Sequence, residues 1–213
     1  MFFIGRNQER KNIVAALKEG VNVILKGKYG IGRTALVNQI IAMTQDQWRF
    51  IVLDFSLSPA QAEASALSSQ ASFRQPKRKF GTDKPGQRLI HHWNLEGKPG
   101  VIVLDNVAGL SSQKKAFIRR LNRLNRFHFI AIGEEFLPEK DLGLLRRELI
   151  PSQVITLRYL SVDNGEKMLR YFSEKYRFHW SENQIQMWAS ATHGYPLGLK
   201  EIVRRELERL GRR

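Results

Sequence analysis

The chain has 213 residues, no cysteine, and 35 Lys and Arg against 20 Asp and Glu, which gives a formal net charge of +15 at pH 7. Without cysteine it can form neither disulfides nor thiolate zinc sites nor a thiol nucleophile. Its apolar runs are strand-sized and no secretory signal is apparent, so we expect a cytoplasmic protein with no membrane partner. The charge favours a polyanionic partner, with nucleic acid ahead of an anionic membrane surface. The alternative is a soluble domain that happens to be basic and has no such partner.

A phosphate-binding loop is the first clear pattern along the chain. An apolar strand at Val21–Leu25 leads into a glycine-rich turn and then into a helix from Thr34 to about Thr44. The spacing matches G-x-x-x-x-G-K-[ST], with arginine at the lysine position. We expect nucleotide to be bound by Gly27, Gly30, Gly32, Arg33 and Thr34.

Physical chemistry explains these residue types. Glycines let backbone N–H groups converge on phosphate oxygens, and the start of the helix adds positive potential. The hydroxyl of Thr34 can bind Mg²⁺. Arg33 keeps the positive charge of lysine but replaces a compact, mobile ammonium with a bulky planar fork. We therefore expect nucleotide binding more readily than fast hydrolysis.

A strongly basic loop follows the second expected strand. That strand, Phe50–Phe55, is apolar on both faces, and an Ala/Ser/Gln-rich helix comes after it. Residues 74–88 then combine proline and glycine with six basic residues and a single acid. A solvated loop is the alternative, but Phe73 and Phe80 flank the charges and favour contact with nucleic acid. The residues of this loop that we expect to contact DNA are Lys77, Arg78 and Lys79.

The third expected strand, Val101–Asn106 (VIVLDN), resembles a Walker B strand. Such a strand places Asp105 at the carboxyl edge of the sheet beside the phosphate loop, where it would hold Mg²⁺ together with Thr34. A hydrolytic enzyme normally has glutamate next, whereas the amide of Asn106 cannot act as a base at neutral pH. Hydrolysis should be slow, and Glu134, after the next strand, is the nearest substitute carboxylate.

A helix whose charged residues are all basic is expected at Ser112–Phe127. It follows a short helix at Leu89–Leu95 and the third strand. An apolar stripe marks its core face, and the charged residues around the stripe are all basic, which favours contact with a phosphate backbone. Its expected DNA contacts are Lys115, Arg119, Arg120 and Arg123. A fourth strand at Phe127–Gly133, a helix at 141–149 and a last strand at Val154–Leu157 complete the predicted sheet.

The remaining sequence predicts only helices, at about Asp163–Tyr176, Ser181–Ala191 and Pro196–Leu210. We therefore expect two units. Residues 1–160 would form a nucleotide-binding α/β core, and residues 161–213 would form a helical lid.

Several motifs occur in an order that resembles AAA+ and related STAND-type P-loop ATPases over essentially the whole chain. They are FIGR-x-x-E at Phe3–Glu9, the phosphate loop, VIVLDN, the strand ending at Gly133 and HGYPLGLKEI near the end. The resemblance implies an α/β fold of three αβα layers, with a parallel sheet of order 5-1-4-3-2 and a C-terminal helical lid. It also implies that ATP and Mg²⁺ bind between core and lid, with Pro196 against the nucleotide.

The same resemblance implies a homo-oligomer with composite sites, in which a neighbour supplies an arginine finger. Arg146 and Arg147 follow the fourth strand, where such a finger is expected, with Arg119 or Arg120 as alternatives. The other interpretation of Arg146 and Arg147 is that they are solvated residues at a helix end. Among small AAA+ proteins, the basic segments are most similar to the DNA-wrapping helper ATPases of transposons.

These observations lead to three hypotheses. The first is an ATP-responsive protein that forms a ring or helical filament on double-stranded DNA and recruits a partner enzyme such as a transposase, with weak or absent hydrolysis. The second is an active motor that loads onto DNA. The third is a pseudo-ATPase scaffold whose nucleotide site is vestigial.

Overall fold

A five-stranded parallel sheet forms the centre of the molecule, with strand order β2-β3-β4-β1-β5. The computed structural model describes residues 3–68, 85–93 and 98–211. The strands are β1 (Asn22–Lys26), β2 (Arg49–Asp54), β3 (Gly100–Val107), β4 (Phe127–Gly133) and β5 (Ser152–Thr156). The expected order 5-1-4-3-2 is the same arrangement counted from the other edge, so that prediction is confirmed.

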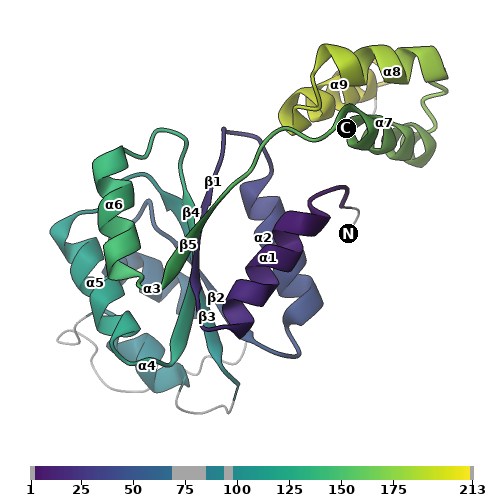
Figure 1. The fold of residues 1–213 in the computed structure, drawn as a ribbon. Helices are drawn as coiled ribbons and strands as arrows, with labels where there is room; N and C mark the ends of the chain where they lie inside the picture. Colours follow the sequence, from purple (N-terminus) through teal and green to yellow (C-terminus); the bar gives the residue numbers. More distant parts are fainter. Residues whose placement is uncertain (1–2, 69–84, 94–97, 212–213) are drawn as a thin grey trace.

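Helices cover both faces of this sheet (Figure 1). One face carries α1 (Asn7–Lys18) and α2 (Arg33–Thr44). The other face carries α3 (Pro59–Ser68), α4 (Gln87–Trp93), α5 (Ser112–Asn122) and α6 (Glu139–Glu148). The expected α/β class with three layers is therefore confirmed.

Alternation along the strands explains why both faces are covered. In β3, Val101 and Val103 pack into the cluster beneath α1 and α2, whereas Ile102 and Leu104 pack into the opposite one. All four side chains are buried. A strand that is apolar at every position is stable only between two helical layers, as in parallel sheets generally.

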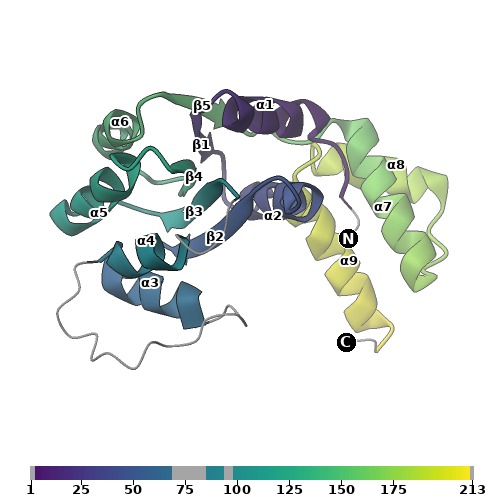
Figure 2. The ribbon, with the colours of Figure 1, turned by 90° about the horizontal axis from the view of Figure 1, so that it is seen from below.

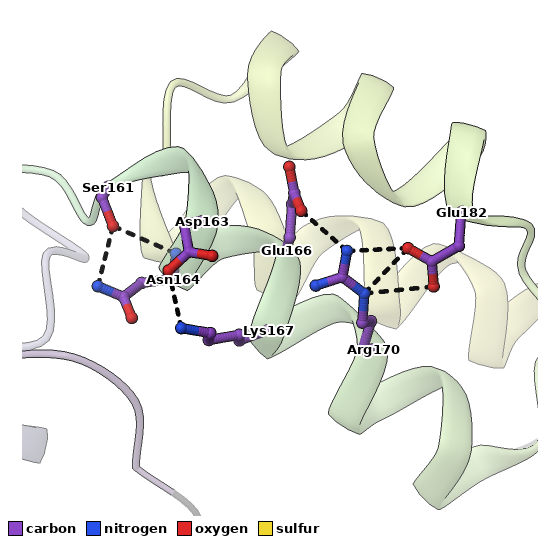
Figure 3. Close-up of polar contacts among 7 residues, drawn as sticks. All are labelled: Ser161, Asp163, Asn164, Glu166, Lys167, Arg170 and Glu182. Carbon is purple, nitrogen blue, oxygen red and sulfur yellow. Dashed lines mark hydrogen bonds and ion pairs between the residues drawn. The ribbon is translucent and has the colours of Figure 1, made fainter.

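The last three helices lie together, apart from the sheet (Figures 1 and 2), and pack around their own apolar cluster. They are α7 (Val162–Tyr176), α8 (Glu182–Ala191) and α9 (Pro196–Arg209), and we call them the lid. Arg170 of α7 forms ion pairs with Glu166 on its own helix and with Glu182 on α8 (Figure 3). A capping box of Ser181 and Gln184 begins α8.

One helix differs in length from its prediction. The basic helix expected at Ser112–Phe127 ends earlier, at Asn122, because Asn125 adopts a left-handed conformation (φ 49°) and turns the chain toward β4. Among the described residues, no helix is both long enough and apolar enough to cross a membrane.

Candidate nucleotide-binding site

The phosphate loop lies between the end of β1 and the start of α2. Gly30 and Gly32 have φ angles of 68° and 95°, in the left-handed region that favours glycine. A Cβ atom on Gly32, the N-cap of α2, would meet nothing within 4 Å, so the loop has open space there. Unpaired N–H groups at the start of α2 adjoin this space, which suits a phosphate group.

Thr34 and Asp105 meet at the carboxyl edge of the sheet. The Thr34 hydroxyl lies 3.4 and 3.5 Å from the two carboxylate oxygens of Asp105. Burial raises the pKa of the Asp105 carboxyl, and the nearby charges of Glu134 and Asp54 also raise it, although hydrogen bonds oppose the shift. A cation bound here would offset that cost.

The donor set fits Mg²⁺. A hydroxyl and a carboxylate are hard oxygen ligands, and Mg²⁺ commonly takes its remaining ligands from water and substrate phosphates. Within the described ranges, no group of three His, Cys, Asp or Glu side chains could hold a metal by itself. Thr34 and Asp105 would therefore hold Mg²⁺ as part of a complex with nucleotide.

The Arg33 side chain is bonded to the end of β4 and the residue that follows it. This side chain is only 7% exposed, and its guanidinium donates hydrogen bonds to the Gly133 carbonyl and to Glu134 Oε2, the latter at 3.0 Å. The next acid, Glu135, accepts a 2.9 Å hydrogen bond from the backbone N–H of Tyr29 in the loop. The segment after β4 thus directs two carboxylates at the phosphate loop, and Glu134, the expected substitute base, is engaged by Arg33.

Sequence reasoning missed Asp54, the last residue of β2. This residue lies in register with Asp105, and its Oδ1 accepts a 3.1 Å hydrogen bond from the Asn106 amide. Hydrogen bonds from Ser56 and then from Asn106 lower the pKa of the Asp54 carboxyl. Asn106 itself is left-handed, with φ 59°. The amide after Asp105 therefore holds a second carboxylate close to Asp105.

An apolar cavity of about 120 Å³ adjoins the loop. It is lined by the N-terminal segment, by Ile31 and Ala35 around the loop, and by lid residues that include Met168 and Pro196. Apolar walls with a few polar groups suit a flat heteroaromatic base. Pro196, the first residue of α9, lines this cavity, and its contact with nucleotide stays a prediction. Met168 carried no motif by which it could have been found.

The lid rests directly on the loop. The Tyr195 hydroxyl donates a 2.7 Å hydrogen bond to the Tyr29 carbonyl, and a Cβ atom on Gly30 would lie 2.6 Å from the Cβ of Leu197. The rings of Tyr159 and Tyr195 pack with centroids 5.1 Å apart. These contacts join the lid to the phosphate loop directly.

The basic residues expected to contact DNA in α5 and at its C-cap, Arg123, differ in the interactions that they make within the protein. Arg119 forms an ion pair with buried Glu148 of α6, and Arg120 donates a hydrogen bond to the Pro85 carbonyl. Lys115 is half-buried, and Arg123 is exposed. Arg119 and Arg120 therefore stabilise the fold, and Arg123 is the best placed of the four to meet a partner.

Arg123 and Arg147 share one surface. Together with Arg119 they line a polar hollow of about 540 Å³ between the ends of α5 and α6, which we call the basic hollow. Its other lining residues are Asn122, Asn125 and Glu148. Since α5 leads back to the start of β4, this hollow lies at the amino ends of the strands, whereas the phosphate loop lies at their carboxyl ends. Arg146 is exposed one residue before Arg147. Lys77, Arg78 and Lys79 lie outside the described residues.

No protein-family model and no curated protein sequence matches this chain. Solved structures do. Cdc6p from Pyrobaculum aerophilum is similar over 97% of this chain, with a TM-score of 0.67 and 17% identity. The Orc1 protein of Aeropyrum pernix, solved in complex with DNA, is similar over 98%, with a TM-score of 0.63 and 14% identity. The RuvB Holliday junction branch migration motor of Thermotoga maritima is similar over 99%, with a TM-score of 0.62 and 14% identity.

These similarities establish the fold. The chain has the fold of AAA+ P-loop ATPases, as the resemblance in sequence implied. It spans 63%, 66% and 65% of the three proteins named, in that order. Because identities this low concern the fold alone, the transposon-helper assignment stays a prediction.

Proposed function

We propose that this chain is an ATP-responsive DNA-binding protein that assembles on duplex DNA. The observation that carries the proposal is the convergence of three features at one edge of the sheet. The glycine loop and the start of α2 offer N–H groups to phosphates, Thr34 and Asp105 offer oxygen ligands to Mg²⁺, and the apolar cavity beneath the lid offers a site for the base.

Hydrolysis should be slow. Bound ATP would supply a phosphoanhydride that water can cleave, and such cleavage is usually assisted by a carboxylate that orients the water. Here Asn106 donates to Asp54, and Glu134 is paired with Arg33. The expected role of ATP is therefore to stabilise a conformation of the loop and lid.

Charge supports the DNA part of the proposal. The net charge of +15 and the exposed arginines of the basic hollow suit phosphate contacts, which are largely independent of sequence. Orc1 was solved in complex with DNA, and RuvB is described as a Holliday junction motor. Recruitment of a partner enzyme such as a transposase belongs to the same proposal and rests on size and charge.

A scaffold with a vestigial nucleotide site is the second candidate. The specific observation that favours it is the partly buried ion pair of Arg33 and Glu134, because it engages the side chain at the position normally directed at the β- and γ-phosphates. A fast motor has less support, because no carboxylate follows Asp105.

Assembly gives the first test. We expect sedimentation velocity and electron microscopy to show rings or helical filaments when duplex DNA and a non-hydrolysable ATP analogue are both present, and smaller species when either is omitted. A neighbour's Arg146 or Arg147 would complete each site, as in head-to-tail assemblies. A monomer under all four conditions, still binding DNA tightly, would rule out the oligomeric mechanism.

Neutralising the basic hollow gives the second prediction. The double variant Arg123→Gln/Arg147→Gln should weaken binding equally for unrelated duplex sequences and lower the salt slope by about one unit per lost phosphate contact. The measurement is fluorescence anisotropy over a series of salt concentrations. Arg205→Gln, at an exposed position of the lid, is the control for loss of positive charge. An unchanged slope in the double variant would show that the hollow serves another purpose.

A further inference from the structure

The most unusual feature of the candidate site is the environment of Arg33. In a phosphate loop of this pattern, the residue at this position normally reaches the β- and γ-phosphates. Here the guanidinium donates instead to the Gly133 carbonyl and to Glu134, whose side chain is 17% exposed. Both partners are largely removed from water, so each charge is compensated chiefly by the other.

The phosphates of a bound nucleotide would therefore be held by different groups of the loop. The α- and β-phosphates, which ATP and ADP share, would be held by backbone N–H groups and the start of α2, and these donors do not depend on Arg33. The γ-phosphate, which only ATP carries, would most need a cation from position 33. That cation is compensated, and Glu135, bonded to the Tyr29 N–H, adds a further negative charge beside the loop.

We propose that Glu134 sets the nucleotide selectivity of this site, by compensating Arg33 so that ATP and ADP bind with similar affinity. The inference rests on the proposed function, because it requires nucleotide to bind at the loop. It assigns Glu134 a role in specificity in place of the role of a water-activating base. The wild type should thus bind ATP and ADP with dissociation constants that agree within about threefold.

Glu134→Gln tests the proposal. This variant should release the charge of Arg33 toward the γ-phosphate and raise the affinity for ATP by about tenfold, the typical effect of one charge-assisted hydrogen bond. The affinity for ADP should change much less. The measurement is isothermal titration calorimetry with each nucleotide and Mg²⁺, which gives the ratio of the dissociation constants for ADP and ATP. If Glu134 had only a structural role, the variant would leave this ratio unchanged. Glu139→Gln is the matched control, because its pair with Lys26 is exposed (81% for Glu139) and does not involve Arg33.

A double variant keeps the test decisive if Glu134→Gln folds poorly. Arg33→Gln/Glu134→Gln replaces a compensated ion pair with two neutral amides and leaves no buried charge unpaired. Its ADP-to-ATP ratio should return to within about threefold of the wild-type value. A strong preference of the wild type for ATP, or an equal ratio in the wild type and Glu134→Gln, would overturn the inference alone. Absence of nucleotide binding in the wild type and both variants would overturn the proposed function as well.

Discussion

Replacing Gly194 by alanine is expected to lower the free energy of unfolding by about 3–5 kcal/mol. Gly194 lies in the turn between α8 and α9 with a φ angle of 72°, and an added Cβ atom would lie 2.1 Å from the Leu160 carbonyl oxygen. That oxygen belongs to the backbone of the segment joining β5 to α7, so the clash cannot be relieved by a rotamer change. The backbone must move, and the 3.1 Å hydrogen bond from the Leu160 N–H to the Gly194 carbonyl would be strained with it.

Gly20→Ala separates this clash from backbone strain. Gly20 has nearly the same φ angle, 74°, but the nearest atom to its added Cβ would be His128 Cε1 at 4.0 Å. Only the cost of a left-handed alanine remains, about 1 kcal/mol. Denaturant unfolding of both variants gives the comparison. Equal losses of stability would show that the segment between β5 and α7 does not pack against the lid turn as described.

Removing the carboxylate of Asp105 should have the largest effect on function. Asp105→Ala is expected to reduce the affinity for ATP in the presence of Mg²⁺ by about tenfold to a hundredfold, because it removes a charged metal ligand. The effect should be much smaller when EDTA replaces Mg²⁺, since the loop N–H groups are unchanged. An equal loss in both conditions would indicate that the variant disturbs the loop and not the metal.

The sequence predicts the sheet and the phosphate loop well, because both depend on local patterns. The part of β3 that precedes Asp105, from Val101 to Leu104, is apolar and buried at every position, and the glycine spacing fixes where the loop meets α2. Strand order followed from the resemblance. Placing Asp105 beside Thr34 needed only the rule that carboxyl ends of parallel strands share an edge.

The chemistry around the loop could not be predicted in the same way. Arg33 and Glu134 are 101 positions apart, and Asn106 and Asp54 are 52 apart. Which carboxylate meets which donor depends on side-chain direction at the ends of neighbouring strands, and no local pattern specifies this direction. The basic hollow could not be predicted from the sequence either, because only the packing of α5 on α6 shows that Arg123 and Arg147 share a surface.

The most direct measurement is a titration of the purified chain with ATP and Mg²⁺, compared with Thr34→Ala and with Thr156→Ala. Thr34 adjoins Asp105, whereas Thr156 is exposed at the end of β5 and serves as the matched control. We predict saturable binding in the wild type and in Thr156→Ala, with an affinity at least about tenfold lower in Thr34→Ala. No binding by the wild type, or indistinguishable affinities in all three proteins, would contradict a nucleotide site at this loop.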